Sequence, residues 1–310
     1  MGFELNILRD AVARHGRVTR VVIAALRGSS PREVGAAMLV WKDGQSGTIG
    51  GGALEFEAAQ TARDGATGIS QHALGPDLGQ CCGGAVTLLS EQYTSKSVAA
   101  LQKTVIARAV GARRDLPLSV SRLLANARAQ GITPDTQLID GWMIEPVHRA
   151  TRPIWIWGAG HVGRALVNVL APMPDIAITW VDTGTDRFPD MVPDGVTVLP
   201  AVKPAELVRH APVNAEHLVL TYSHALDLEL CHRLLGHQFA FVGLIGSATK
   251  KARFRSRLAA LGHTSGRIID ITCPIGDPSL GKHPQMIAVG VGADLLRPAI
   301  AAPRTKDLSA

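Results

Sequence analysis

The spacing of apolar residues in the first half of the chain predicts a mixture of helices and strands. Apolar residues recur at helical intervals over 5–15, and the run 18–26 has the nearly continuous apolar character of a strand buried on both faces. Asp43-Gly44 follows the apolar run 37–41 and is typical of a hairpin turn. The other expected elements are a helix from Ala53, a strand over 85–89, one or two helices within 95–130 and a strand over 142–146.

The second half alternates short apolar runs with amphipathic stretches, the pattern of a doubly wound sheet. The expected strands lie at 154–157, 176–181, 217–221 and 240–245, and the expected helices at 164–170, 206–210, 246–257 and 285–296. A further helix is expected after the stretch 222–227 and through Leu235. A polar linker over 148–153 ends in Pro153 and separates the halves. We therefore predict an α/β protein with an N-terminal α+β domain at 1–148, a Rossmann-like, doubly wound C-terminal domain at 149–302 and a tail at 303–310.

Composition and charge narrow the class of protein. A chain of 310 residues with 46% hydrophobic and 19% charged residues is typical of a soluble globular protein. No apolar run approaches the roughly 20 residues that span a membrane, and Glu4, Arg9 and Asp10 lie where a signal peptide has its apolar core. We expect a cytoplasmic protein without a membrane segment. Although the formal net charge is +6, aromatic residues make up only 4%, so small anions or acidic proteins are favoured over nucleic acid.

A glycine fingerprint follows the strand at 154–157. Gly158, Gly160 and Gly163 stand between this strand and an amphipathic helix, the context in which a Gly-x-Gly-x-x-Gly turn binds a phosphate at a helix N-terminus. Asp182 ends the next strand and has the type and distance of an acid that holds a ribose hydroxyl. Alternatively, the turn is a packing device that binds nothing.

Two adjacent cysteines, Cys81 and Cys82, stand in a glycine-rich turn that ends in Gly83-Gly84. Neighbouring α-carbons are about 3.8 Å apart and disulfides usually need about 4.4 to 6.8 Å, so a bridge between the two would be strained. We expect at least one free thiol, which backbone N–H groups could activate as a nucleophile or soft-metal ligand. The alternative is that two small thiols simply pack there.

Polar residues also follow the expected strand at 217–221. His224 and Asp227 fall beyond its carboxyl end, where ligands of such sheets bind. The alternative is that Ser223 or Asp227 caps the next helix.

The helix after the strand at 240–245 begins at Gly246 and Ser247 and carries Lys250 in its first turns, followed by further cations. Positive side chains at a helix N-terminus oppose the helix dipole unless an anion lies nearby, so this pattern favours a phosphate. A solvated basic face is the alternative.

Six motifs, spread over nearly the whole chain, have counterparts in one known protein family. They are Gly28-Ser-Ser-Pro-Arg32 with Gly35, Gly47-Thr-Ile-Gly-Gly-Gly-Ala-Leu-Glu55, Gly79-Gln-Cys-Cys-Gly-Gly84, Gly158-Ala-Gly-His-Val-Gly163, Ile245-Gly-Ser-Ala-Thr-Lys250 and Pro274-Ile-Gly276. In this order, they resemble the XdhC/CoxI family, the xanthine dehydrogenase accessory proteins. The resemblance implies an XdhC/CoxI-type domain, with the Cys81-Cys82 motif, before the Rossmann-like domain.

The resemblance further implies a cytoplasmic maturation chaperone rather than an enzyme. Its members are thought to bind the molybdenum cofactor, a molybdopterin with a dithiolene-held metal and a phosphate. They shield it while a cysteine desulfurase replaces an oxo ligand by sulfur, and pass it to the large subunit of xanthine dehydrogenase. On this interpretation the cofactor-binding residues are Cys81 and Cys82 at the molybdenum, with Gly158, Gly160, Gly163, Asp182, Gly246, Ser247 and Lys250 around the anionic end. We also expect a homodimer, the commonest assembly.

Two other functions stay open on the sequence alone. The first is an NAD(P)-dependent oxidoreductase, in which Gly158 to Gly163 and Asp182 hold the dinucleotide and His224 acts as acid or base. The second is a scaffold that only docks the dehydrogenase. The sequence leaves undecided which form of the cofactor and which client enzyme are involved.

Overall fold

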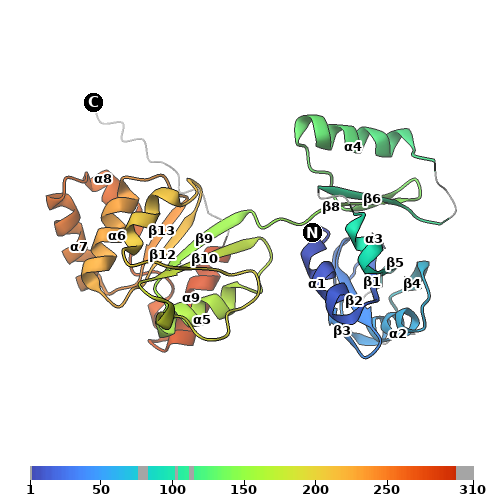
Figure 1. Ribbon diagram of the computed structural model, residues 1–310, viewed down its shortest axis with the longest axis horizontal. Helices are drawn as coiled ribbons and strands as arrows, with labels where there is room; N and C mark the ends of the chain where they lie inside the picture. Colours follow the sequence, from blue (N-terminus) through green and yellow to red (C-terminus); the bar gives the residue numbers. More distant parts are fainter. Residues whose placement is uncertain (1, 76–82, 102–103, 112–114, 298–310) are drawn as a thin grey trace. The chain divides into compact units, whose positions relative to one another are not determined.

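The computed structural model describes residues 2–75, 83–101, 104–111 and 115–297. By its contacts the chain divides into two compact units, Met1–Arg149 and Ala150–Ala310 (Figure 1). The first unit is α+β and the second is a parallel α/β unit, which confirms the predicted fold class.

The first unit is built on a five-stranded antiparallel sheet of order β3-β2-β1-β5-β4. Its central strand β1 is buried on both faces: Val21 and Ile23 pack against α2, whereas Val18 and Val22 face α1 and a second, three-stranded sheet of order β6-β8-β7. This double burial explains the continuous apolar run in the sequence. The elements are α1 (Leu5–His15), β1 (Val18–Arg27), β2 (Ala37–Trp41), β3 (Gly44–Gly47), α2 (Gly52–Arg63), β4 (Gly68–Ala73), β5 (Ala85–Tyr93), α3 (Ser95–Ala99), β6 (Val105–Ala109), α4 (Leu118–Gln130), β7 (Gln137–Ile139) and β8 (Trp142–Pro146).

A buried ion network joins the two sheets of the first unit. Arg20 on β1 donates to both carboxylate oxygens of Glu145 on β8, at 3.0 and 2.7 Å, and Arg108 on β6 donates to the same carboxylate and to Glu91 on β5. Burial raises the pKa of Glu145, but the two guanidinium groups outweigh it and hold the pKa below its usual value. Each buried charge therefore has a partner, as a low-dielectric interior requires.

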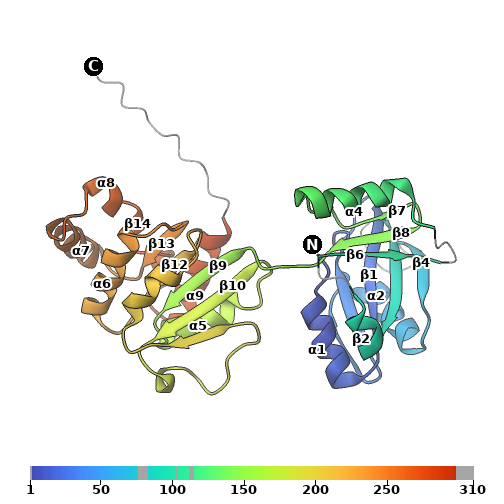
Figure 2. The same ribbon diagram turned by 45° about the horizontal axis from the view of Figure 1, so that its top comes forward.

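The second unit is a six-stranded parallel sheet of order β11-β10-β9-β12-β13-β14, which is the Rossmann order 3-2-1-4-5-6. Figures 1 and 2 show α5 and α9 on one face of this sheet and α6 on the other. The elements are β9 (Arg152–Trp157), α5 (His161–Leu170), β10 (Ile176–Asp182), the 3₁₀ helix η2 (Thr185–Arg187), β11 (Thr197–Pro200), the 3₁₀ helix η3 (Pro204–His210), β12 (Glu216–Val219), α6 (His224–Leu235), β13 (Phe241–Leu244), α7 (Ala248–Ala260), α8 (Ser265–Ile268), β14 (Ile271–Thr272), the 3₁₀ helix η4 (Pro278–Leu280) and α9 (Pro284–Leu296).

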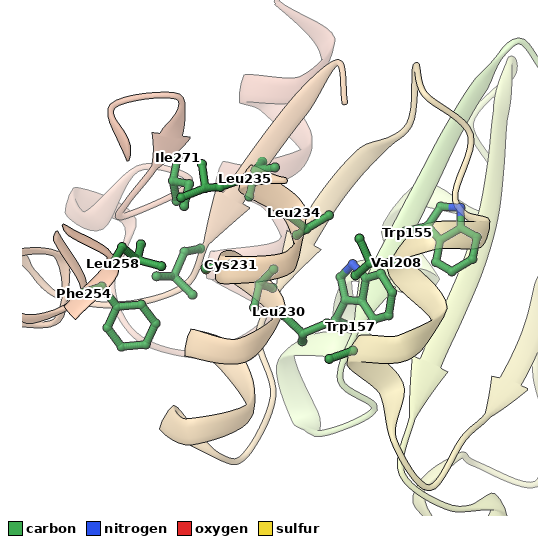
Figure 3. Packing of buried hydrophobic residues seen from close by; sticks show 14 of the residues in the cluster. Trp155, Trp157, Val208, Leu230, Cys231, Leu234, Leu235, Phe254, Leu258 and Ile271 are labelled. Atoms are coloured by element: carbon green, nitrogen blue, oxygen red, sulfur yellow. The ribbon is translucent and has the colours of Figure 1, made fainter. Parts of the chain in front are cut away.

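Side chains of β9 alternate between the two cores of the second unit. Ile154 and Ile156 pack with α5 and α9, whereas Trp155 and Trp157 pack on the opposite face, where Figure 3 shows Leu230 and Leu234 of α6 beside Trp157. The central strand is thus covered on both sides. Parallel sheets are usually covered on both faces in this way. The packing on both sides holds the end of β9, where the glycine turn begins, in place.

Five strands, β4, β6, β7, β11 and β14, were not predicted from the sequence. Each lies at an edge of its sheet, and β4 contains Ser70, Gln71 and His72 with exposed or half-exposed side chains, so it carries no continuous apolar run. The stretch 206–210 was predicted to be helical, and it forms part of the 3₁₀ helix η3, which begins at Pro204. The predicted hairpin is confirmed, with Trp41 opposite Gly44.

Among the described residues, no helix is both long and apolar enough to cross a membrane.

Candidate functional site

The glycine turn after β9 lies at the carboxyl edge of the parallel sheet, between the ends of β10 and β12. Two of its glycines are required by the protein itself. Gly158 has a φ of +122°, and a Cβ there would lie 2.5 Å from the carbonyl oxygen of Leu220. A Cβ on Gly163 would lie 2.0 Å from the carbonyl oxygen of Gly158. These two residues therefore let the turn close and let α5 pack against it.

Gly160 is different, because nothing in the described protein requires a glycine there. Its φ of −71° suits any residue, and a Cβ would meet no atom within 4 Å. Gly160 is the N-cap of α5, where the helix makes no side-chain cap hydrogen bond. The first N–H groups of a helix have no intrahelical partner, so this end of α5 presents donors to open space that a side chain would obstruct. The arrangement suits an anion.

Asp182 holds the turn from inside. Its Oδ2 accepts a hydrogen bond from the N–H of Ala159 at 2.6 Å, and its Oδ1 accepts from the N–H and the Oγ1 of Thr183 at 2.6 and 3.1 Å. The residue is only 2% exposed. The carboxylate thus fixes the backbone of the glycine turn, and a ribose hydroxyl would have to compete with three internal donors for it.

Two arginines and a tyrosine surround this turn. Arg164 donates to the carbonyl oxygens of Ala159, at 3.1 Å, and of Arg187, at 2.9 Å. The guanidinium of Arg187 lies over the ring of Tyr222, 4.8 Å from its centroid, and its Nε is 3.7 Å from Oδ1 of Asp182. That Nε is buried and makes no hydrogen bond to any described residue. Two guanidinium groups therefore lie beside the turn.

Sequence reasoning did not single out Arg164, Arg187 or Tyr222. A signal existed for Tyr222, since it is one of two tyrosines in the chain, follows a strand end and is 68% exposed. Arg187 lies five residues beyond Asp182, and only the η2 turn brings it back toward the sheet.

His224 and Asp227 take different places on α6. His224 is the first residue of the helix and is exposed. Asp227 is fully buried: its Oδ1 accepts from the N–H and Oγ1 of Thr221, at 3.0 and 2.8 Å, and its Oδ2 from Nζ of Lys250 at 2.6 Å. Ser223 accepts from the N–H of Leu226 and caps the helix, as the structural alternative predicted.

The start of α7 has a similar structural explanation. Ser247 is its N-cap and accepts from the N–H of Lys250, while a Cβ on Gly246 would lie 2.6 Å from the Lys250 side chain. Lys250 itself is only 12% exposed at its side chain and donates to Asp227 and to the carbonyl oxygen of Ile245. Its charge is used inside the protein, so this geometry does not support the predicted countercharge role.

Two glycines from other parts of the first unit, Gly50 and Gly84, lie close to the loop after β1. Because Arg27 of β1 pairs with Ala85 of β5, the loop after β1 lies beside the segment before β5. A Cβ on Gly84 would lie 2.2 Å from the carbonyl oxygen of Ser29, and a Cβ on Gly50 would lie 2.6 Å from the ring of Pro31. Gly84 thus lets its backbone approach that of Ser29, and Gly50 leaves room for the ring of Pro31.

Glu55 organises the loop that contains Gly50. Its Oε2 accepts from Oγ1 of Thr48 and from the N–H groups of Ile49 and Gly51. Burial raises the pKa of Glu55, but these hydrogen bonds outweigh it and the pKa is lowered overall. The ionised carboxylate therefore works as a backbone clamp.

One polar atom in this region has no partner. The Oγ of Ser30 is buried and makes no hydrogen bond to any described residue. Cys81 and Cys82 lie outside the described residues, so the predicted thiol site remains a prediction, although Gly83 and Gly84 follow them directly in the sequence. Within the described part of the chain, no three His, Cys, Asp or Glu side chains gather in a way that could hold a metal ion.

The two other cysteines belong to the second unit and are free, buried thiols. Burial, with a contribution from Asp227, raises the pKa of Cys231 to about 12, and burial also raises the pKa of Cys273. Both stay protonated near neutral pH, which makes them poor nucleophiles.

Fold and site together define a two-unit protein whose second unit is a Rossmann-type domain with a glycine turn at the start of α5. The family described as the XdhC Rossmann domain matches residues 154–295, and the one described as the XdhC and CoxI family matches residues 11–72. The chain belongs to the XdhC and CoxI family.

Two known proteins illustrate the likeness. The "Uncharacterized protein YqeB" of Escherichia coli (strain K12) is 28% identical over 152 residues, which cover 49% of this chain and 28% of that protein. A crystal structure described as a xanthine dehydrogenase (BH1974) from Bacillus halodurans has a TM-score of 0.66 at 20% identity, over 97% of this chain and 98% of that one. The second likeness is one of fold.

Proposed function

We propose that this protein binds the molybdenum cofactor and acts as a maturation factor for xanthine dehydrogenase. Membership in the XdhC and CoxI family supports the link to xanthine dehydrogenase maturation. The observation that carries the cofactor part is Gly160, whose lack of a side chain has no cause within the described protein. A ligand that approaches the backbone supplies that cause.

The anionic end of the cofactor fits the turn at the start of α5. A phosphate there would receive hydrogen bonds from the unpaired N–H groups of the first turn and gain from the helix dipole. Arg164 and Arg187 add positive charge around the same turn, and Asp182 keeps its backbone in place.

The flat pterin ring fits the exposed face of Tyr222. The guanidinium of Arg187, itself planar and delocalised, already lies over the ring of Tyr222. The tyrosine ring can therefore stack with a planar group of this kind. Stacking of a heterocycle on an aromatic side chain is worth about 1 to 3 kcal/mol. Tyr222 and the turn would thus hold the two ends of one phosphorylated heterocycle.

The metal end belongs, in this proposal, to Cys81 and Cys82 of the first unit. Thiolates are soft ligands and suit a sulfur-bound metal. The cofactor, when bound, supplies the molybdenum centre that the client enzyme needs. The chain supplies the thiols, which directly precede Gly83 and Gly84 in the sequence.

The remaining parts of the proposal concern the cell. The protein works in the cytoplasm as a homodimer, a cysteine desulfurase delivers the sulfur while the cofactor is held, and the large subunit of xanthine dehydrogenase receives the cofactor.

A competing function is an NAD(P)-dependent oxidoreductase with His224 as acid or base. The environment of Asp182 argues against the oxidoreductase, because its carboxylate already accepts three hydrogen bonds from within the protein.

An anaerobic titration distinguishes these functions. The purified protein is titrated with molybdenum cofactor and, separately, with NADH and NADPH, and binding is followed by fluorescence and equilibrium dialysis. We expect binding of the cofactor in preference to either dinucleotide. We also expect weaker binding, and less activated dehydrogenase, in Cys81→Ala, Cys82→Ala or the double variant; Cys231→Ala, a buried thiol of the other unit, is the control.

Three results would count against the proposal. Full cofactor binding and dehydrogenase activation by the double cysteine variant would remove the role of the thiols. Binding of NADH or NADPH without binding of the cofactor would favour the oxidoreductase. Absence of both, with retained binding to the dehydrogenase, would identify a docking scaffold.

A further inference from the structure

A pocket of about 220 Å³ lies in the second unit between α7, α8 and the end of the sheet formed by β13 and β14. The residues that line it are mainly apolar, and Figure 3 shows three of these residues, Phe254, Leu258 and Ile271, side by side. The residues that line it are Leu244, Lys251, Phe254, Arg255, Leu258, Ser265, Ile268, Ile269, Ile271 and Cys273. None of them belongs to the glycine turn after β9.

One face of α7 forms a wall of this pocket. Lys251, Phe254, Arg255 and Leu258 are spaced i, i+3, i+4 and i+7, so they share one side of the helix. Phe254 and Leu258 are buried, at 5% and 1% exposure, and form the apolar part. Lys251 and Arg255 are exposed and bring their charges to the rim. The pocket therefore combines an apolar interior with two cations at its edge.

These two cations have no partner in the described part of the chain. Neither the side chain of Lys251 nor that of Arg255 forms an ion pair or a hydrogen bond there, and α7 has no acidic residue in its first turn. Burial raises the pKa of the Cys273 thiol at the pocket wall, and the positive charges of Lys250 and Lys251 oppose that rise.

An exposed apolar side chain, that of Ile269, lies at the edge of this pocket. Ile269 lines the pocket and is 80% exposed, an unusual position for a large aliphatic side chain beside an apolar cavity. A ligand with an apolar body would cover part of this surface and gain free energy from its burial.

We propose that this pocket binds a small carboxylate whose apolar body is about the size of one aromatic ring. An apolar cavity of about 150 Å³ holds a benzene molecule, so a pocket of about 220 Å³ has room for one substituted ring. The ring lies against Phe254, Leu258 and Ile271, and the carboxylate meets Lys251 and Arg255. The arginine offers paired donors that match a carboxylate.

The test uses 4-fluorophenylacetate as the probe on the full chain and 4-fluorotoluene as its neutral analogue, followed by fluorine NMR. We expect the acid to bind with a Kd on the order of 1 mM or tighter, given its size. The toluene should bind about tenfold more weakly, because it lacks the charged contact. The variant Lys251→Glu/Arg255→Glu should lose this preference and leave the weak binding of the toluene unchanged.

A matched control lies on the other side of α7. Arg253→Glu/Arg257→Glu changes the net charge of the same helix by the same amount, but neither residue lines the pocket. This variant should bind the acid like the wild type. Equal loss in the two double variants, or no binding of the acid by the wild type, overturns the proposal. Circular dichroism checks that each variant is folded.

Discussion

At the scale of single residues, several polar side chains of the second unit have internal partners that their sequence position does not reveal. His217 is the clearest case. It lies in the middle of β12 and is fully buried, its Nδ1 accepts from Nε1 of Trp157 at 3.2 Å, and its Nε2 has no partner among the described residues. Burial lowers its pKa to about 3, and His237 contributes in the same direction. The imidazole is therefore neutral in the folded protein.

A pH dependence of stability follows from His217. Its pKa is about 3 in the folded state and 6.5 in the unfolded state, so the unfolded state binds the extra proton first. The stabilisation is complete above pH 6.5 and is lost as the pH falls toward 3. Between pH 7 and pH 5 this one group should remove about 2 kcal/mol from the free energy of unfolding, at about 1.4 kcal/mol per pH unit below 6.5.

Urea denaturation at both pH values, on the wild type and on His217→Phe, measures this effect. Other titrating groups act on both proteins, so the difference between their losses isolates His217. A loss of the same size in the two proteins would show that His217 is not the group responsible.

The candidate site was partly predictable at this scale. The types and spacing of Gly158, Gly160 and Gly163 predict the turn, because a strand and a helix flank them locally. The hydrogen bond from the N–H of Ala159 to Asp182 was not predictable, since it joins residues 23 positions apart and depends on the side-chain rotamer. The partners of Lys250 were missed for the same reason.

At the scale of elements, prediction succeeded where the apolar pattern is long or the turn chemistry specific. The helix α1 has the predicted bounds, and the hairpin after Trp41 is where Asp43-Gly44 indicated it. Prediction failed for β4, β6, β7, β11 and β14, because an edge strand needs backbone pairing from a distant segment and carries little pattern of its own. Which loops of the first unit meet, such as Ser29 with Gly84, likewise depends on pairing between β1 and β5.

The ion pair between α6 and α7 gives a prediction at this scale. Lys250→Met leaves the carboxylate of Asp227 buried without its cation, and loss of one partner of a buried pair typically removes about 3 to 5 kcal/mol. Lys251→Met, at the neighbouring exposed position, should change the free energy of unfolding by less than about 0.5 kcal/mol. Urea denaturation of the two variants measures the difference.

This comparison also separates two roles for Lys250. If the residue served the cofactor phosphate instead of Asp227, Lys250→Met would weaken cofactor binding and leave stability close to that of the wild type. A destabilised protein that still binds the cofactor would confirm the structural role.

At the scale of the whole molecule, the chain combines two units of different fold. The α+β unit contains the glycine loop clamped by Glu55 and, elsewhere in its sequence, the Cys81-Cys82 motif, and the parallel unit contains the turn at the start of α5. The sequence predicted both fold types, because alternating strands and helices distinguish the second half from the first. Strand order, which brings the ends of β10 and β12 to the glycine turn, came only from the structure.

The central claim is that the N-terminus of α5 holds the phosphate of the bound cofactor, and Gly160→Val tests it most directly. A Cβ at Gly160 meets no protein atom and the backbone there suits any residue, so the free energy of unfolding should fall by no more than about 1 kcal/mol. The added side chain would stand where the phosphate approaches. Gly266→Val, whose Cβ also meets no atom within 4 Å, is the matched control in the same unit.

Equilibrium dialysis of molybdenum cofactor against the wild type and the two variants, without oxygen, is the decisive measurement. The account predicts at least about a tenfold weaker affinity for Gly160→Val and an unchanged affinity for Gly266→Val. Wild-type affinity in a folded Gly160→Val protein would contradict it, because the cofactor would then be held elsewhere.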